Sequence, residues 1–341
     1  MKWLFWALSL AIFVLISALI ILSCAEEFAE EPLEIIWTMP PNGYDGMPEP
    51  IKIQFNHIIE AATISNAITI SPSLGELDRR SSSWIDGNTY LVAFAEPPEP
   101  GKKYTVTVSP LVKDRYGNSL SLPYTFSFTY RFGIEYTWPE SGEKDTSPIR
   151  GIGITFSYPI DVEACRTAFS ISPSVEGRFS PSYVYYIGRT TRLDFEPFKS
   201  LMPSTEYTVT INKNAKARNG EPLTEPYIFS FTTERFRVRD TFPEDGKKDV
   251  SLSVNYISIT FNASLDMESC QSAFSISPPV KGKFNSYYSI YYGVKLYFYP
   301  SEPLAPFTKY TVTINTSAKA NNGESLAEPY TFSFTTGEKE D

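Results

Sequence analysis

Histidine is almost absent from the sequence, because its 341 residues contain only one, His57. A single imidazole cannot form a histidine metal cluster, and no Ser-His-Asp triad is indicated. His57 follows a short apolar segment, at a position where corresponding segments further along have Tyr158 and Ala263. A position that accepts such different side chains is typical of an exposed strand end. We therefore expect no catalytic residues, no metal and no cofactor, and we do not expect an enzyme.

Cysteine is also scarce, with three residues in the chain. Cys165 and Cys270 precede the same Ser-Ile-Ser-Pro sequence, at a position where an earlier segment has Ile64. A position that accepts isoleucine or cysteine is typically apolar and buried. Both thiols are therefore predicted to be free core residues in different segments, and no structural disulfide is expected.

Basic residues are too few to balance the acidic ones. The chain has 30 Lys and Arg against 39 Asp and Glu, and its formal net charge is −9. Without a basic stripe, this composition excludes nucleic acid as a partner and argues against an anionic membrane surface. Asp194 and Glu196 alternate with Leu193 and Phe195, so we expect them on a solvent-facing sheet surface rather than in a glycosidase cleft.

The N-terminus has a long apolar run, from Trp3 to Leu22, followed by Ser23 and Cys24. An apolar stretch that ends at a small residue is typical of an export signal. The sequence Ile-Leu-Ser-Cys ending at Cys24 resembles the bacterial lipobox, which implies cleavage before Cys24 and attachment to the membrane through lipid on it. An uncleaved helix remains the alternative, because about 20 apolar residues can span a bilayer. Either interpretation predicts a bacterial envelope location, outside the cytoplasm.

An internal repeat organises the rest of the chain. Tyr-Thr-Val-Thr starts at Tyr104, Tyr207 and Tyr310, and both intervals are 103 residues (207 − 104 and 310 − 207). Phe-Ser-Phe recurs with the same period, and two markers with one period indicate three copies of a domain-sized unit. The predicted segments are a signal peptide (1–23), an acidic tether (24–32), three domains (33–131, 132–235 and 236–337) and a tail (338–341).

Each unit contains about seven short apolar segments separated by turns. Ile152, Ile154 and Phe156 alternate with small or polar residues, the period-two pattern of a half-buried strand. Many short strands with Pro and Gly turns predict an antiparallel Greek-key sandwich. The expected fold class is therefore all-β, with three tandem Ig-like sandwiches behind an N-terminal signal or anchor helix. Asp161 is the predicted cap of a short helix, and Tyr207 is predicted to form a tyrosine corner.

The order of these motifs resembles the bacterial Ig-like domain of S-layer proteins, the SbsA type. The resemblance rests on Pro-x-x-Gly, Leu-x-Phe-x-Pro, Pro-x-x-x-Tyr-Thr-Val-Thr and Phe-Ser-Phe-Thr-Thr, and it covers nearly the whole chain after residue 32. The first copy departs most, since it ends in Phe-Thr-Tyr130. The resemblance implies an Ig-like sandwich in a cell-envelope protein, and a structural or adhesive module without catalytic residues.

Two further features lie near the ends of the predicted domains. The joints between copies are short, and Phe132 and Phe236 are expected to wedge between neighbouring domains. Asp45, Asp145 and Asp249 recur after a glycine turn, where we expect them to cap the turn. Calcium binding by these aspartates is the alternative, although no Asp-x-Asp-x-Asp run supports it.

Tyrosine-rich segments are the candidate binding surfaces. Tyr183 and Tyr185 in copy 2, and Tyr288 and Tyr292 in copy 3, could stack against sugar rings. Cross-strand aromatic packing is the alternative role. The expected function is a non-enzymatic spacer, adhesin or scaffold, and the alternative is an envelope carbohydrate-binding protein. The partner would be an envelope protein or a glycan.

Overall fold

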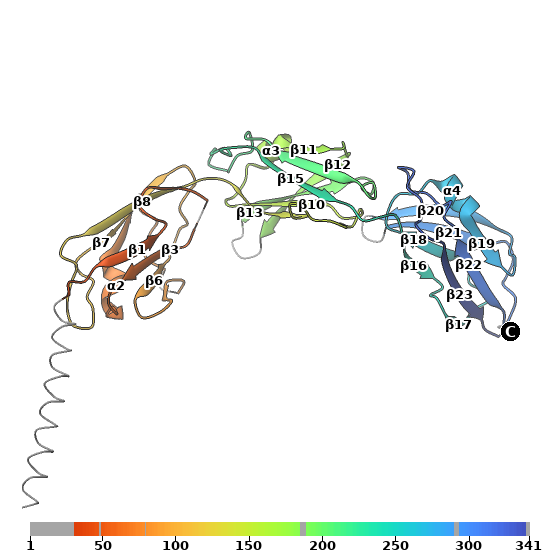
Figure 1. The fold of residues 1–341 in the computed structure, drawn as a ribbon, viewed down its shortest axis with the longest axis horizontal. Coiled ribbons are helices and arrows are strands. Elements are labelled where there is room, and N and C mark those ends of the chain that lie inside the picture. The colour runs from red at the N-terminus through yellow and green to blue at the C-terminus, as the bar shows by residue number, and fades with distance from the viewer. Residues whose placement is uncertain (1–30, 48, 79, 185–188, 290–292, 339–341) are drawn as a thin grey trace, which may run out of the picture. The chain divides into compact units, whose positions relative to one another are not determined.

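The computed structural model describes residues 31–338, except for residues 48, 79, 185–188 and 290–292 (Figure 1). The predicted signal peptide, Cys24, Tyr185 and Tyr292 lie outside the described residues, and the side chain of Tyr183 is not described. Contacts along the chain separate two compact units, one ending at Phe132 and one starting at Gly133. The first unit contains copy 1, and the second contains copies 2 and 3.

Copy 1 consists of two sheets and one short helix. Its first sheet has the order β1 (Ile35–Met39), β3 (Ile51–Phe55), β6 (Thr89–Val92), β5 (Ser83–Trp84). Its second sheet has the order β2 (Tyr44–Gly46), β8 (Tyr124–Tyr130), β7 (Lys103–Val108), β4 (Ile68–Ser71). The helix α2 (Ala61–Ala67) immediately precedes β4.

Copy 2 repeats this arrangement. Its first sheet has the order β12 (Gly177–Val184), β13 (Arg189–Pro197), β10 (Ile152–Phe156), β9 (Ile134–Trp138). Its second sheet has the order β11 (Phe169–Ser172), β14 (Glu206–Ile211), β15 (Tyr227–Thr232), and the helix is α3 (Val162–Ala168).

Copy 3 repeats it once more. Its first sheet has the order β16 (Val238–Phe242), β18 (Ile257–Phe261), β21 (Gly293–Pro300), β20 (Gly282–Ser289). Its second sheet has the order β17 (Lys247–Val250), β23 (Tyr330–Thr336), β22 (Lys309–Ile314), β19 (Phe274–Ser277), and the helix is α4 (Met267–Ala273).

The predicted all-β fold of three tandem Ig-like copies is confirmed (Figure 1). Strands alternate buried and less buried residues, as in β3 and β7, so that the core lies between the two sheets. One detail differs from the purely antiparallel expectation. The short strands β2 and β17 pair in parallel with β8 and β23, because the chain crosses from one sheet to the other after the glycine turn.

The tyrosine corners are confirmed in all three copies. Each tyrosine that opens a Tyr-Thr-Val-Thr strand is buried, and its hydroxyl accepts a hydrogen bond from a backbone N–H five residues earlier. The donors are Glu99 to Tyr104 at 3.0 Å, Met202 to Tyr207 at 2.9 Å and Ala305 to Tyr310 at 3.0 Å. The bond satisfies a buried hydroxyl and fixes the loop before the strand.

Two core predictions have different outcomes. Cys165 and Cys270 are free and fully buried, as predicted from Ile64, which is buried as well. The expected wedge at Phe236 is wrong. Its ring stacks on Phe261 inside copy 3, with centroids 5.2 Å apart, because the joint residue completes the core of its own domain.

The recurring aspartates do not cap their turns in the expected way. Asp45 instead forms an ion pair with Arg131, with 2.8 Å between Oδ2 and Nη2. Asp145 and Asp249 have left-handed backbones, with φ of 55° and 54°. Aspartate tolerates this conformation better than most residues, which explains Asp145 and Asp249, whereas Asp45 lies in the strand β2.

Candidate functional site

The tyrosines proposed for binding are only partly within the described residues. Tyr288 is half-buried and packs against the core of copy 3, and burial raises the pKa of its hydroxyl. Its neighbour Tyr287 points the other way and is 63% exposed. The solvent-facing ring in this part of β20 is therefore Tyr287 rather than Tyr288.

A larger aromatic surface lies on the outer side of the first sheet of copy 3. We call it the aromatic face, and it consists of Phe242, Tyr256, Tyr287, Tyr297 and Tyr299. Phe242 is at the end of β16, Tyr256 directly precedes β18, Tyr287 is in β20, and Tyr297 and Tyr299 are in β21. Phe242 is 43% exposed and Tyr299 is 38% exposed.

Strand alternation explains why these rings face outwards. Leu296 and Phe298 are buried in the core, so Tyr297 between them and Tyr299 after them project from the opposite side of β21. In the centre of the sheet, Ser258 pairs with both Tyr297 and Phe242. Ser258 is only 2% exposed although it faces outwards, because larger neighbouring side chains cover it.

Four of these rings, those of Phe242, Tyr256, Tyr297 and Tyr299, form a continuous cluster. The centroids of Tyr297 and Tyr299 are 5.9 Å apart and their planes differ by 20°. Tyr256 packs edge-on against Tyr297 at 5.2 Å and also contacts Phe242 at 5.1 Å. Burial raises the pKa of Tyr297, and the neighbouring hydroxyls of Tyr256, Tyr299 and Tyr287 raise it further.

This face could not be predicted from any one motif, because its residues come from four separate segments of the chain. The signal available was the alternation in Lys-Leu-Tyr-Phe-Tyr over residues 295–299, which places two tyrosines on one side of a strand. The other members depend on strand register, which a single sequence does not specify.

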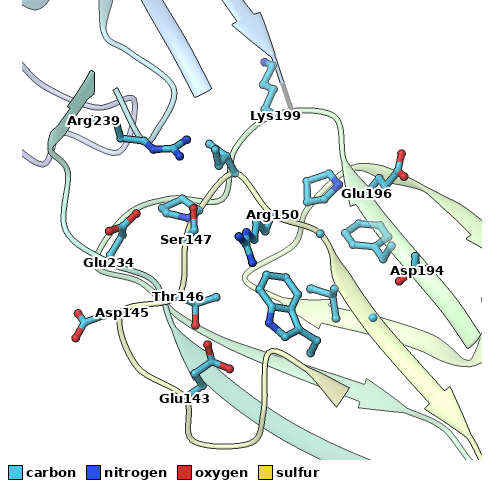
Figure 2. A pocket seen from close by; sticks show the side chains of 18 of the residues that line it. Glu143, Asp145, Thr146, Ser147, Arg150, Asp194, Glu196, Lys199, Glu234 and Arg239 are labelled. Atoms are coloured by element: carbon cyan, nitrogen blue, oxygen red, sulfur yellow. The ribbon is translucent and has the colours of Figure 1, made fainter. Parts of the chain in front are cut away.

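The second candidate is a hollow of about 1000 Å³ in the second unit (Figure 2). Its basic residues are Arg150, Arg192, Lys199, Arg237 and Arg239, and its acidic residues are Glu143, Asp145, Asp194, Glu196 and Glu234. Arg150 lies over the ring of Trp138, with its guanidinium carbon 5.4 Å from the ring centroid.

Several charges around the hollow neutralise one another. Arg192 pairs with Asp194 at 2.8 Å, and Arg237 pairs with Glu234 at 2.8 Å. Asp194 and Glu196 lie on a sheet surface, as expected, and form ion pairs there, but they also line the hollow, which the sequence did not predict. Among the described residues that line the hollow, none is a histidine or a cysteine.

His57 is not the exposed strand end that its variability suggested. Its side chain is 11% exposed, and its Nδ1 lies 2.8 Å from Oδ2 of the fully buried Asp114. Asp114 also accepts hydrogen bonds from Asn118 and from the backbone N–H of Tyr116. Burial alone would raise the pKa of Asp114, but the hydrogen bonds from His57 and Asn118 outweigh burial and lower it. The pair therefore organises the loop after β7.

Within residues 31–338, gaps excepted, no three or more His, Cys, Asp or Glu side chains are grouped so as to hold a metal ion. Of the helices in the same part of the chain, none combines the length and apolar composition needed to cross a bilayer.

The repeat, the two-sheet copies and the tyrosine corners agree with a known family. The profile of the bacterial Ig-like domain matches residues 29–130, 131–233 and 234–336. The chain belongs to the bacterial Ig-like domain family. These three matches account for most of the chain and correspond to the three copies described above.

Solved structures show more distant likeness. The N-terminal part of the bacterial S-layer protein SbsC is 15% identical with a TM-score of 0.25, and the match covers 61% of this chain and 46% of that one. An L,D-transpeptidase from Mycobacterium tuberculosis is 12% identical with a TM-score of 0.23, covering 46% and 64%. Native alpha-2-macroglobulin from Escherichia coli, domains MG0-NIE-MG1, is 13% identical with a TM-score of 0.34, covering 90% and 98%. Likenesses at this level carry no weight for function. No curated protein sequence matches the chain.

Proposed function

We propose that this protein is a lipid-anchored component of the bacterial envelope, in which three Ig-like domains act as a non-enzymatic spacer, adhesin or scaffold. The observation that supports a spacer most directly is the joint between copies 2 and 3. Glu324 of copy 3 accepts a hydrogen bond from Ser204 Oγ of copy 2 at 2.8 Å, and the backbone N–H of Phe236, at the start of copy 3, donates to the same oxygen at 3.1 Å. Ser200 and Ser264 add a hydroxyl–hydroxyl bond of 2.9 Å. Direct bonds of this kind suit a module that holds its neighbour in place.

The lipid anchor rests on the lipobox-like sequence that ends at Cys24. The test is the mass of the mature N-terminus after expression in a bacterium. We expect the chain to begin at an acylated Cys24 and to partition with membranes, and we expect Cys24→Ala to retain Met1. Cys165→Ala is the matched control, because that thiol lies in the core of copy 2. An intact Met1 in the membrane-bound wild type would refute the lipoprotein and leave the uncleaved helix.

Carbohydrate binding is the second candidate function, and the aromatic face of copy 3 favours it. Clustered tyrosines on a sheet surface offer flat apolar rings together with hydroxyl groups, the combination that suits sugars. The partner of the protein would then be an envelope glycan rather than an envelope protein.

A further inference from the structure

We propose that the aromatic face of copy 3, together with the adjacent Lys283 and Lys295, binds an acidic polysaccharide whose sugar rings have carboxylate groups. This inference rests on the second proposed function, carbohydrate binding, and specifies its site and its ligand class.

On the same surface in copy 2, acidic partners neutralise the positive charges. Arg178 in β12 pairs with Glu196 at 2.7 Å, and Arg192 in β13 pairs with Asp194 at 2.8 Å. These four side chains form two ion pairs on the outer side of the sheet. The charges on this surface are therefore already neutralised, and no basic side chain of these two pairs is left to attract a charged ligand.

Strand register identifies the corresponding positions in copy 3. Arg178 lies opposite Glu196, and Lys283 lies opposite Tyr299 in the same way. Arg192 pairs with Thr155 of β10, and Lys295 pairs with Thr260 of β18. Copy 3 therefore keeps both basic residues but has Tyr299 and Tyr297 in place of the two acidic partners.

The two lysines are consequently left without carboxylate partners. No salt bridge within the described residues includes Lys283 or Lys295. Among the outward positions of the four strands, the acidic residue is Asp240, on β16. It lies at the opposite edge of the sheet from Lys283 and in the same row as Lys295, from which Thr260 of β18 separates it. The β20–β21 side of the face is therefore basic in a chain whose net charge is −9.

The tyrosines supply the rest of the recognition. The exposed rings of Tyr287 and Tyr299 can stack against the apolar side of a sugar ring, and Tyr297 packs between Tyr299 and Tyr256 beneath them. In the hydrogen bonds of the described residues, neither the Tyr287 nor the Tyr299 hydroxyl has a partner, so both can bond to sugar hydroxyls. Carboxylates of the glycan would then lie beside the two ammonium groups.

Two other occupants fit less well. A neutral glycan would use the rings but leave both lysines unpaired. A second copy of this chain, packed face to face about a twofold axis, would bring like charges together, which costs free energy.

The experiment uses the full chain in detergent and measures fluorescence anisotropy of labelled probes. The acidic probe is an oligogalacturonate, and the neutral probe is a dextran oligosaccharide of equal length. We expect the oligogalacturonate to bind more tightly than dextran, and its affinity to fall as salt rises because exposed charges are screened.

Three double variants test the site. We expect Tyr297→Ala with Tyr299→Ala to weaken oligogalacturonate binding about tenfold or more. Lys283→Ala with Lys295→Ala should weaken it about fivefold and flatten its salt dependence. The matched control is Arg178→Ala with Arg192→Ala, which removes the paired cations of copy 2 and should leave binding unchanged. Near-UV circular dichroism checks that each variant is folded. If the tyrosine variant unfolds, the lysine variant still tests whether this face binds the oligogalacturonate, because its changed side chains point towards solvent.

The outcomes separate the inference from the function on which it rests. Equal binding of both probes would overturn the acidic ligand class and leave carbohydrate binding standing. Binding of neither probe would overturn both. Binding that survives both copy 3 variants would place the site elsewhere. Dimerisation of the wild type that the tyrosine variant abolishes, without glycan binding, would assign the face to a second copy. The anchor is tested separately at Cys24.

Discussion

A buried polar pair distinguishes copy 1 from the other copies at the scale of single residues. Asp114 forms an isolated bridge with Ile59, and the same bridge position holds Ala217 in copy 2 and Ala320 in copy 3. Copy 3 also has the buried Ala263 in the place of His57. The sandwich therefore accepts Tyr158 with Ala217, Ala263 with Ala320, or a hydrogen-bonded His–Asp pair at this site, but either member of the His–Asp pair alone would be a buried polar group without its partner.

Removing one member of the His57–Asp114 pair should lower the free energy of unfolding by more than half of the loss caused by removing both. We expect Asp114→Ala to destabilise copy 1 by about 2 kcal/mol, because it leaves His57 and nearby N–H groups unsatisfied. The double variant with His57→Ala reproduces the alanines of copy 3, so its cost should fall short of the sum of the single costs by about 1 kcal/mol. Hydrogen exchange of peptides from β7 and β8 measures copy 1 separately from the other copies. Strictly additive costs would show that the contact contributes nothing.

The two core thiols should be unreactive in the folded protein. Burial raises the pKa of Cys165 to about 12, and burial also raises the pKa of Cys270. The reactive thiolate is therefore scarce at neutral pH, and the surrounding core blocks access. Alkylation by iodoacetamide, followed by peptide mass spectrometry, should label both residues only after denaturation. Fast labelling of either residue in the native protein would contradict its place in the core.

The three short helices differ at the N-cap, the residue that directly precedes each helix. Asp161 and Asp266 accept hydrogen bonds from the backbone N–H three residues later, at 3.0 Å in both α3 and α4. Glu60, before α2, has a similar extended backbone but makes no side-chain capping bond. The longer glutamate side chain does not suit this position, where the capping oxygen must stay close to the helix end.

Shortening that side chain should therefore stabilise copy 1. We expect Glu60→Asp to raise its free energy of unfolding by about 0.5–1 kcal/mol, and Asp266→Ala to lower that of copy 3 by about 1 kcal/mol. Hydrogen exchange of α2 and α4 measures both effects. Glu268→Ala, which changes a charge in the first turn of α4 without removing its cap, is the control. A Glu60→Asp variant no more protected than the wild type would show that the loop before α2 prevents capping.

Strands, turns and the repeat were predictable from the sequence wherever a pattern within a short stretch of residues determines them. The 103-residue period, the alternation in strands such as β10 and the proline before each tyrosine corner all lie within short stretches of sequence. The parallel strand β17, the His57–Asp114 pair and the aromatic face all depend on which distant strands become neighbours. Register and crossover are set by the packing of the whole sandwich, so short-range pattern could not reveal them.

At the scale of the whole molecule, the carboxylate of Glu324 is one of the groups that join copy 2 and copy 3. Oε1 of Glu324 accepts one bond from across the joint, from Ser204 of copy 2, and one from the backbone N–H of Phe236 at the start of copy 3, while Oε2 is buried without a hydrogen-bond partner. Asn322 from the same loop donates to the carbonyl oxygen of Pro203 at 3.0 Å. Because Phe236 is part of the core of copy 3, its N–H links the joint to the stability of that domain.

Loss of this carboxylate should weaken copy 3 and loosen its joint with copy 2. We expect Glu324→Ala to cost about 1–3 kcal/mol, because the buried N–H of Phe236 and the hydroxyl of Ser204 lose their acceptor. For a domain of this size, each kcal/mol lowers the unfolding temperature by roughly 4–8 °C, which calorimetry of the full chain resolves. Glu324→Gln keeps an acceptor oxygen and should cost less, and Glu328→Ala removes an exposed charge further along the same loop as a control. If Glu324→Ala unfolds at the same temperature as Glu328→Ala, the joint is held by something other than this carboxylate, and the spacer function loses its main support.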